Sequence, residues 1–276
     1  MSRILEFLKV LFLGLVEGIT EWLPISSTGH MLLVDEFLQL KQTEAFKELF
    51  FVVIQLGAIM AVVLLFWEKM LPVTLHKKEK PTLRKDVVSL WLKVVVACIP
   101  GALAVFLFDD LVDRYLHLPV VIAAALIVYG FGFLAVEKWN EKRPARVTAL
   151  SELSYKDAVL IGLFQVLSII PGTSRSGSTI IGALLLGIPR TVAAEFTFFL
   201  AVPVMFGYSL LKLIKIGFAF TTSQWLLLLA GCLAAYLTSL AVIRFLMAFI
   251  KKHSFFAFGI YRIILGTAVI LYFTFF

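Results

Sequence analysis

Two carboxylates stand four positions apart near the start of the chain, inside a largely apolar stretch. At this spacing Glu17 and Glu21 lie on one face of a helix. Two carboxylates that face each other in a low-dielectric environment either share a proton or hold a hard cation. Pro24 ends the helix directly afterwards, and no charged loop follows. The pair is therefore predicted to be functional, not an idle pair in solvent.

A polar break follows this helix end and leads into a new helix. Ser26, Ser27, Thr28 and Gly29 precede His30, which falls in the first turn. A serine or threonine at a helix N-cap, with free N–H groups and the positive end of the helix dipole behind it, forms an anion site. We expect Ser26, Thr28 and Gly29 to bind the anion. His30 is then placed for acid–base or nucleophilic work on it.

A second polar break has the same design but carries an arginine. Its candidate binding residues are Thr173, Ser174, Ser176 and Gly177, with Arg175 among them. Arginine suits phosphate because its planar fork donates two hydrogen bonds and stays charged. One break thus holds acids and an imidazole, and the other holds a guanidinium. We predict a single composite site for a polyanion where the two breaks meet.

Composition indicates which elements position these residues. Of the 276 residues, 61% are hydrophobic and 16% are charged. Soluble chains are about 45–50% apolar and about 25% charged, so a soluble domain is excluded. The apolar residues recur in blocks along the whole chain, which indicates an all-α polytopic membrane protein. The formal net charge of +7 lies mainly in short loops, so we expect it to orient the chain and to bind no nucleic acid.

Six apolar blocks come close to the roughly 20 residues with which a helix crosses a bilayer core of about 30 Å. Two further apolar regions, residues 4–34 and 158–186, contain the polar breaks. Most of their flanks are too short to span alone, so each region is interpreted as a re-entrant helix–loop–helix. The predicted spans are residues 50–67, 87–108, 118–136, 193–214, 225–247 and 255–275.

The loop charges predict the orientation of the spans. Loop 68–86 carries six basic residues, Lys77, Lys78 and Lys80 among them, and loop 137–157 carries five. The loop between them carries Asp109, Asp110 and Asp113 with a single arginine. The positive-inside rule therefore puts the two basic loops in the cytoplasm and both chain termini outside. Lys212 and Lys215 fall near the outer face in this arrangement, against the rule.

The two broken regions match each other at a constant offset of 148 positions. Ser26 matches Ser174 and Gly29 matches Gly177. Each broken region precedes three spans, and an odd number of crossings turns the second copy upside down. We therefore predict an inverted-topology repeat in which each half has one re-entrant helix–loop–helix and three transmembrane helices. The predicted units are residues 1–136 as the first repeat, 137–157 as a cytoplasmic linker and 158–276 as the second repeat.

The two breaks also resemble a known family. The stretch EGITEWLPISSTGH from Glu17 to His30 resembles the first signature of the bacterial undecaprenyl pyrophosphate phosphatases, the bacitracin-resistance membrane phosphatases. The stretch PGTSRSG at residues 171–177 resembles their second signature, and the resemblance covers nearly the whole chain. It implies hydrolysis of undecaprenyl diphosphate to the monophosphate. It also implies activation by a divalent cation, for which we expect Mg²⁺ or Ca²⁺.

Carried over by position, the resemblance implies roles for five residues. The glutamate pair of the family falls at Glu17 and Glu21, its serine and histidine at Ser27 and His30, and its arginine at Arg175. We expect Glu17 and Glu21 to hold the cation. The expected catalytic set is Glu21, Ser27, His30 and Arg175. The resemblance further implies an active site that opens to the outer face of the bacterial cytoplasmic (inner) membrane.

Three classes of function fit a membrane protein with such breaks. The first is a lipid-diphosphate phosphatase that recycles the lipid carrier for cell-wall synthesis and confers bacitracin resistance. The second is a transporter or flippase of an anionic isoprenoid lipid, and the third is a scaffold. A transporter needs an anion cradle but no carboxylate pair beside an imidazole, so the residues favour the enzyme. The expected partners are the lipid substrate and the bilayer, and a homodimer stays open.

The sequence leaves the attacking group open between His30 and Ser27. Neutral imidazole is a competent nucleophile near neutral pH, whereas a serine hydroxyl needs a base to activate it. His30 either attacks phosphorus directly or takes the proton from Ser27. We favour the direct role of His30 on the sequence alone.

Overall fold

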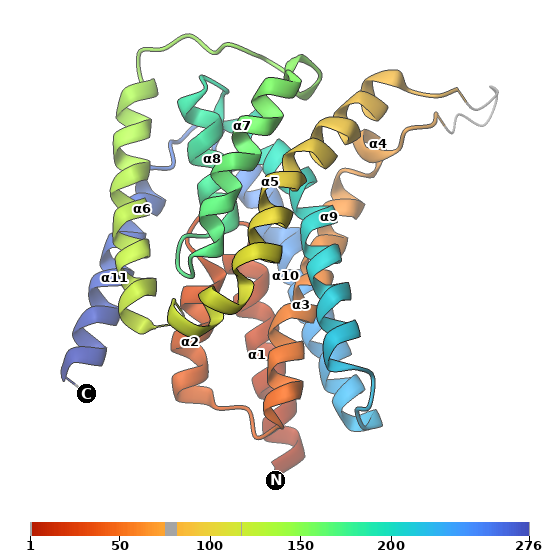
Figure 1. The fold of residues 1–276 in the computed structure, drawn as a ribbon, viewed down its shortest axis with the longest axis vertical. Coiled ribbons are helices and arrows are strands. Elements are labelled where there is room, and N and C mark those ends of the chain that lie inside the picture. Colours follow the sequence, from red (N-terminus) through yellow and green to blue (C-terminus); the bar gives the residue numbers. More distant parts are fainter. Residues whose placement is uncertain (1, 75–81, 117, 276) are drawn as a thin grey trace.

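The computed structural model describes residues 2–74, 82–116 and 118–275, and within these ranges it is all helical apart from one isolated β-bridge (Figure 1). Lys77, Lys78 and Lys80 lie outside the described residues. The helices are α1 Ser2–Thr20, α2 Ser27–Leu38, α3 Glu44–Leu65, α4 Trp67–Met70, α5 Lys85–Tyr115, α6 Pro119–Asn140, α7 Tyr155–Val166, α8 Arg175–Leu185, α9 Arg190–Ile216, α10 Thr222–Phe249 and α11 Phe256–Phe275, with 3-10 turns η1 Leu150–Glu152 and η2 Leu167–Ile169.

Six of the described helices are long and apolar enough to cross a bilayer: α3, α5, α6, α9, α10 and α11. The chain is therefore a multi-pass membrane protein, and each predicted span overlaps one of these helices. Helices α3 and α9 begin several residues before their apolar blocks. In α3 the Thr43 hydroxyl accepts a hydrogen bond from the Phe46 N–H at 3.3 Å, so an N-cap starts the helix on its polar side.

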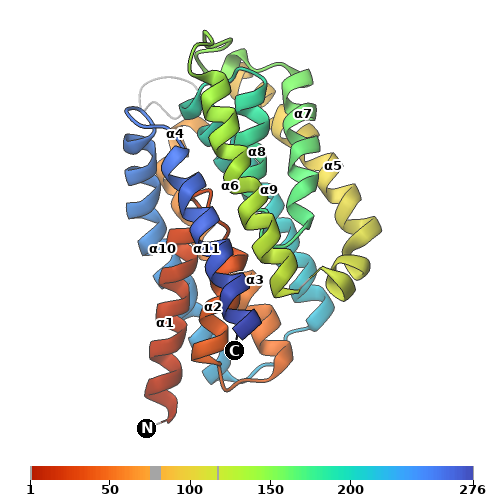
Figure 2. The ribbon, with the colours of Figure 1, turned by 90° about the vertical axis from the view of Figure 1, so that its left-hand side faces the viewer.

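The two broken regions form two helical hairpins, in which α1 has 19 residues and the other three helices are short. Helices α2, α7 and α8 have 12, 12 and 11 residues, which is about 16–18 Å of helix against a bilayer core of about 30 Å. Figures 1 and 2 show α1 and α2 in the half of the molecule that holds the N-terminus, and α7 and α8 in the opposite half. The two breaks meet near the middle of the molecule.

Close backbone packing places α1 against α10. A Cβ atom added at Gly14 would lie 2.4 Å from the Gly231 carbonyl oxygen, and one at Gly18 would lie 2.6 Å from the Ala235 carbonyl oxygen. Any larger side chain would push the two helices apart, so these glycines allow the close approach of α1 and α10. The Ser239 hydroxyl also donates to the Gly18 carbonyl at 3.4 Å. These contacts fix the position of α1, the helix that carries Glu17, along α10.

An aromatic contact anchors the first break to α9. Trp22 is fully buried, and its ring meets Phe198 edge-on with 5.3 Å between ring centroids. Phe196 and Phe199 are fully buried in the same core. Replacing a buried aromatic of this size by alanine typically costs about 3–5 kcal/mol. Trp22 therefore fixes the break that directly follows Glu21.

Lys212 is neutralised inside the structure. Its ammonium group pairs with the Glu48 carboxylate of α3, and the side chain is largely buried. A paired lysine of this kind adds no free positive charge to the end of the molecule at which it lies. The exception to the positive-inside rule that the sequence suggested at Lys212 is explained by this ion pair.

A capping box and an ion pair fix the start of α7, at the end of the molecule that carries the basic loops. Ser154 and Asp157 form a capping box, and Arg146 donates to the Asp157 carboxylate at 2.5 Å. Burial raises the pKa of Asp157, but the hydrogen bonds from Ser154 and Arg146 outweigh it and hold the pKa below its usual value. Asp157 therefore stays ionised and ties the 137–157 segment to α7.

Candidate active site

Two serines give the two breaks the same backbone geometry. Ser26 and Ser174 have positive φ angles of 74° and 71°, which non-glycine residues rarely adopt. The Ser26 hydroxyl accepts from the Gly29 N–H at 3.3 Å, and the Ser174 hydroxyl accepts from the Gly177 N–H at 3.1 Å. Each serine thus caps a helix that starts at the break, α2 in one case and α8 in the other.

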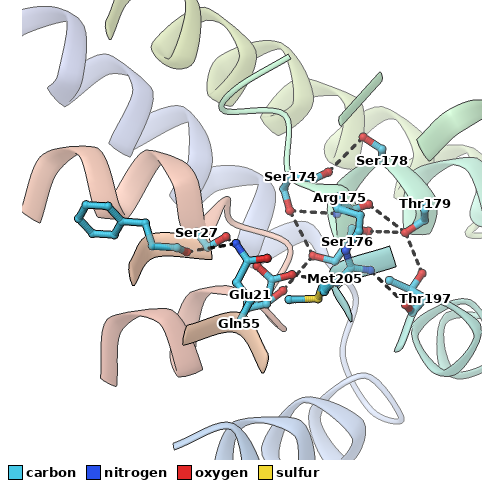
Figure 3. Close-up of polar contacts among 12 residues, drawn as sticks. Glu21, Ser27, Gln55, Ser174, Arg175, Ser176, Ser178, Thr179, Thr197 and Met205 are labelled. Carbon is cyan, nitrogen blue, oxygen red and sulfur yellow. Dashed lines mark hydrogen bonds and ion pairs between the residues drawn. The ribbon is translucent and has the colours of Figure 1, made fainter. Parts of the chain in front are cut away.

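The Glu21 carboxylate joins the two breaks (Figure 3). Its Oε2 accepts a hydrogen bond from the Ser27 hydroxyl at 2.7 Å, and its Oε1 accepts one from the Arg175 Nη2 at 2.8 Å. Both side chains of the ion pair are about nine-tenths buried, with 11% of Arg175 and 9% of Glu21 exposed. Charge-assisted hydrogen bonds in such a site are strong and set the orientation of all three groups.

Further hydrogen bonds fix the position of Arg175. Its Nη1 donates to the Thr197 carbonyl at 3.2 Å, and the Ser176 hydroxyl donates to the Glu21 backbone carbonyl at 3.2 Å. The Thr179 and Thr197 hydroxyls lie 2.9 Å apart and link α8 to α9. The guanidinium is therefore held at both ends, by the acid of the first break and by the backbone of α9.

A cavity of about 200 Å³ opens beside these groups. Both breaks contribute to its wall, together with α3 and α9. Of the residues that the sequence singled out, Glu21, Ser27, Thr28, Ser174 and Arg175 line it. The remaining lining residues are Gln55, Ser168, Ile170, Pro171, Gly172, Val204, Met205 and Tyr208. Hydroxyls, an amide and a guanidinium at a concave wall are suited to the oxygens of a phosphate group.

The residues that form this arrangement of carboxylate, hydroxyl and guanidinium lie within a stretch that matches a known family. The family described as Bacitracin resistance protein BacA matches residues 10–268, which is nearly the whole chain. The chain belongs to the BacA family. The membership predicted from the two signatures is therefore confirmed.

Several relatives of this BacA-family chain are similar to it over nearly their full length. The undecaprenyl-diphosphatase of Enterococcus faecalis is 61% identical over 267 residues, which is 97% of each chain. Undecaprenyl-diphosphatase 1 of Clostridium acetobutylicum is 54% identical over 270 residues, which is 98% of each chain. The undecaprenyl-diphosphatase of Streptococcus agalactiae serotype V is 52% identical over 272 residues.

In this BacA-family chain Glu17 lies outside the lining of the cavity. The helical hydrogen bond from the Glu21 N–H to the Glu17 carbonyl, at 3.0 Å, keeps the two acids on one face, as the spacing predicts. Only 1% of Glu17 is exposed, and its Oε1 has no hydrogen-bond partner among the described residues. A buried carboxylate oxygen without a donor needs a proton or a cation.

His30 contacts a different part of the structure from the cavity. Its Nδ1 lies 2.7 Å from the Ser26 carbonyl oxygen, and its Nε2 lies 2.7 Å from the Tyr261 hydroxyl of α11. The two rings are stacked, with 5.6 Å between centroids. With Nδ1 donating to the carbonyl, Nε2 accepts from Tyr261, so both ring nitrogens are engaged.

The other residues expected to bind the anion lie behind the cavity wall, where most of them hydrogen-bond to the backbone or to the caps of the two breaks. Ser26 caps α2, Ser176 bonds the Glu21 backbone, and Gly29 and Gly177 donate to the two caps. Thr173 is fully buried, and its hydroxyl has no partner among the described residues. These residues are not among those that line the cavity. Their contacts hold the two helix N-termini in place.

Sequence reasoning missed Arg262, which lies inside the last apolar block. Its guanidinium is fully buried and donates to carbonyl oxygens of both breaks: to Pro24 at 3.2 Å, Gly172 at 2.8 Å and Thr173 at 2.9 Å. It also donates to the Leu126 carbonyl of α6 at 3.4 Å. A charge within an apolar span is by default functional, so this rule would have identified Arg262. Gln55 of α3, which lines the cavity, was also not identified as a site residue from the sequence.

The residues at the site fit a hard divalent cation. No group of three His, Cys, Asp or Glu side chains lies close enough to hold a metal within the described part of the chain. Magnesium, however, is commonly held by one or two carboxylates together with waters and substrate phosphates. The unpartnered Glu17 oxygen and the neighbouring Glu21 carboxylate match that donor set.

Proposed function

We infer that this chain is an integral membrane phosphatase that hydrolyses undecaprenyl diphosphate to undecaprenyl phosphate and inorganic phosphate. Relatives named undecaprenyl-diphosphatase, at up to 61% identity over nearly the whole chain, indicate the reaction. The structural observation that carries the inference is the Glu21 carboxylate, which accepts from a hydroxyl and a guanidinium at once. The monophosphate re-enters cell-wall synthesis as lipid carrier, and bacitracin resistance fits the family.

The Ser27–Glu21 contact supports Ser27 as the attacking group. Because the hydroxyl donates to Glu21 at 2.7 Å, the carboxylate takes its proton as Oγ bonds to the terminal phosphorus. The bond from that phosphorus to the bridging oxygen breaks, and Glu21 returns the proton to the leaving undecaprenyl phosphate. Water then attacks the phosphoserine with Glu21 as its base, and the bond from phosphorus to the Ser27 Oγ breaks. Glu21 returns its proton to that oxygen, and inorganic phosphate leaves.

This assignment differs from the preference that the sequence alone gave to His30. Both nitrogens of its ring are hydrogen-bonded, and the nearest groups are Ser26 and Tyr261, not the cavity residues. We assign His30 a positioning role: its bond to the Ser26 carbonyl holds the start of α2, on which Ser27 lies. The alternative in which His30 attacks directly is distinguished by experiment below.

Arg175 and the two helix N-termini supply positive charge to the diphosphate. Phosphoryl transfer depends mainly on positioning and on stabilising charge around the transferred group. Arg175 is bound to Glu21 in the free protein, and a diphosphate entering the cavity offers it a second, more highly charged partner. A divalent cation held by Glu17 and Glu21 would neutralise further phosphate charge. Removing it with a chelator should abolish turnover, and Mg²⁺ or Ca²⁺ should restore it.

The packing of the helices supports an inverted repeat. With the offset of 148, α1 corresponds to α7. By their order in the two halves, α5 corresponds to α10 and α6 corresponds to α11. Helix α1 packs on α10 while α7 packs on α5, and α6 packs directly on α11. An exchange of the two halves therefore maps these contacts onto one another. Together with the basic loops at one end, this supports residues 1–136 and 158–276 as two halves, with the cavity facing the outer side of the inner membrane.

The test measures phosphate release from undecaprenyl diphosphate by the purified full chain. Ser27→Ala should reduce turnover by about a thousandfold or more, as removal of a nucleophile does. The matched control is Ser168→Ala, which removes a hydroxyl from the same cavity wall and should keep most activity. His30→Ala should retain measurable turnover.

Two outcomes contradict the proposal. A Ser27→Ala variant close to the parent, with His30→Ala inactive, would assign the attack to His30. Equal efficiency on inorganic pyrophosphate would contradict a lipid substrate. A shorter prenyl chain should weaken turnover, because each buried CH₂ group contributes about 0.8 kcal/mol.

A further inference from the structure

A second cavity, of about 330 Å³, lies at the end of the molecule that carries the basic loops. It is bounded by the C-terminal ends of α6, α8 and α10 and by the first turn of α9. Helix α8 separates it from the first cavity: Arg175 starts that helix, and Leu184 lies near its other end. The nine helical steps from Arg175 to Leu184 make this separation about 14 Å. The lining residues are Glu137, Asn140, Arg143, Pro144, Ala145, Leu184, Gly187, Ile188, Pro189, Arg190, Thr191, Ile250 and Lys251.

The Glu137 carboxylate and the Leu184 carbonyl in this cavity already have donors. Glu137 accepts from Arg190 through both carboxylate oxygens, at 2.5–3.0 Å, and from the Phe255 N–H at 2.7 Å. The Leu184 carbonyl at the end of α8 accepts from Asn140 at 2.7 Å. The Leu186 carbonyl accepts from Arg146 at 3.0 Å. These bonds also hold the segment after α6 firmly against α8.

Two cationic side chains of the cavity have no anionic partner within the described part of the chain. Arg143 and Lys251 are both exposed and form no ion pair with any described residue, and the Arg143 guanidinium lies over the Trp139 ring, 4.0 Å from its centroid. Helix α9 starts here without a side-chain cap, because Pro189 occupies its N-cap position. Two unpaired cations therefore face a concave wall whose one carboxylate is already neutralised. The excess of donors and positive charge calls for an anion.

We propose that this cavity binds a phosphate group, and that its main source is the headgroup of an anionic phospholipid. Basic pockets between transmembrane helices on the cytoplasmic side suit such headgroups. Trp139 is about half exposed beside Arg143, as is usual for a tryptophan at the depth of the lipid headgroups. In this site Arg143 donates in bidentate fashion to the phosphate, and Lys251 adds a point charge. The proposal is independent of the phosphatase assignment, which uses the other cavity.

The test is a lipid titration of the detergent-purified full chain by native mass spectrometry. Phosphatidylglycerol is the probe, and phosphatidylcholine with the same acyl chains is the zwitterionic comparison. All proteins carry Arg175→Ala, so that phosphate binding at the first cavity is weakened throughout. The cavity variant is Arg143→Ala/Lys251→Ala. The matched control is Lys142→Ala/Lys252→Ala, which removes two neighbouring charges that do not line the cavity.

The cavity variant should bind phosphatidylglycerol about tenfold more weakly or worse, since two charge-assisted contacts are lost. The control should bind within about twofold of the parent by the same scale. Melting temperatures of the variants should be similar, because neither Arg143 nor Lys251 has an ion-pair partner among the described residues, and Arg143 loses only its contact with the exposed Trp139 ring. Added inorganic phosphate distinguishes the two sources of the anion. Displacement of the lipid shows that free phosphate shares the site, and absence of displacement shows that the glycerolipid is required.

Two results would overturn the proposal. One is equal binding of phosphatidylglycerol by the cavity variant and the control variant. The other is equal affinity of the parent protein for phosphatidylglycerol and phosphatidylcholine, which would mean that net negative charge is not recognised. A cavity variant that melts earlier is replaced by Arg143→Gln/Lys251→Gln, which keeps the side-chain volume, and the same two criteria apply.

Discussion

The two breaks share one backbone and differ in their chemistry. In both, a serine with positive φ caps the next helix through the N–H three residues later. The position four residues after the cap also repeats its contact, since His30 bonds the Ser26 carbonyl and Ser178 bonds the Ser174 carbonyl. The reactive positions differ: Ser27 of the first break corresponds to Arg175 of the second.

The difference fits the proposed repeat, in which the two halves share a backbone and the proposed reactive groups are divided between them. Glu21 of the first half corresponds to Ile169 of the second, so only one acid faces the one arginine. Glu17 corresponds to Gln165, and both are buried with one side-chain oxygen that lacks a partner among the described residues. Each break has a serine-capped helix start, but the proposed catalytic groups Glu21, Ser27 and Arg175 come together only where the two breaks meet.

The largest effect is expected at the acid that joins the halves. Glu21→Gln should lower turnover by about a thousandfold, because an amide cannot take the Ser27 proton and general-base removal costs about 10²–10⁴-fold. The matched change in the other half is Ile169→Gln, at the corresponding position, which should keep turnover near that of the parent. Steady-state phosphate release measures both. Comparable losses in the two variants would mean that the halves are not divided in this way.

A smaller loss of turnover is expected for Arg175→Lys, which keeps the positive charge but loses the planar guanidinium that donates two hydrogen bonds at once. The lysine cannot bond Glu21 and the Thr197 carbonyl together, as Arg175 does at 2.8 Å and 3.2 Å. Losing one hydrogen bond to a charged group costs about 1.5–3 kcal/mol, or about 10- to 100-fold in kcat/KM. Turnover close to that of the parent would show that Arg175 does not clamp the phosphate.

Much of this arrangement was accessible from the sequence, because it rests on local patterns. Apolar blocks of membrane-spanning length indicated the six long helices, and the Ser- and Thr-rich breaks indicated that a capped helix begins at each of them. The complementary charges predicted that the breaks meet, and Glu21 does contact Arg175. The roles assigned to these residues remain predictions.

The partners of His30 and Arg262 were not accessible in this way. The His30–Tyr261 contact spans 231 positions, and Arg262 reaches 238 positions back to Pro24. Such contacts depend on how α11 packs on α6 and against the breaks, and the periodicity of one helix carries no information on that packing. The apolar block at residues 255–275 conceals Arg262, because hydropathy averages over a window.

The next prediction concerns Ser26 and Ser174, which form the same N-cap hydrogen bond in the two halves. Ser26→Ala and Ser174→Ala should each lower the free energy of unfolding by about 1 kcal/mol, since each removes one N-cap bond. The similar bond lengths, 3.3 Å and 3.1 Å, predict similar losses of stability. Turnover should fall further for Ser26→Ala, because α2 carries Ser27. Denaturant unfolding in detergent and phosphate release measure the two quantities, and a large inequality in stability would contradict the shared backbone role.

The smallest effect is expected at Tyr261, whose hydroxyl bonds the His30 Nε2. Tyr261→Phe keeps the stacked ring but removes one neutral hydrogen bond, worth about 0.5–1.5 kcal/mol. If His30 only positions the start of α2, turnover should fall about two- to tenfold, with the shape of the pH–rate profile unchanged. If His30 attacks phosphorus, the freed Nε2 is a better nucleophile, and turnover should rise or acquire a new pH dependence. The matched control is Tyr272→Phe on the same helix. The pH–rate profile of Tyr261→Phe therefore separates a histidine that supports the first break from one that performs the chemistry there.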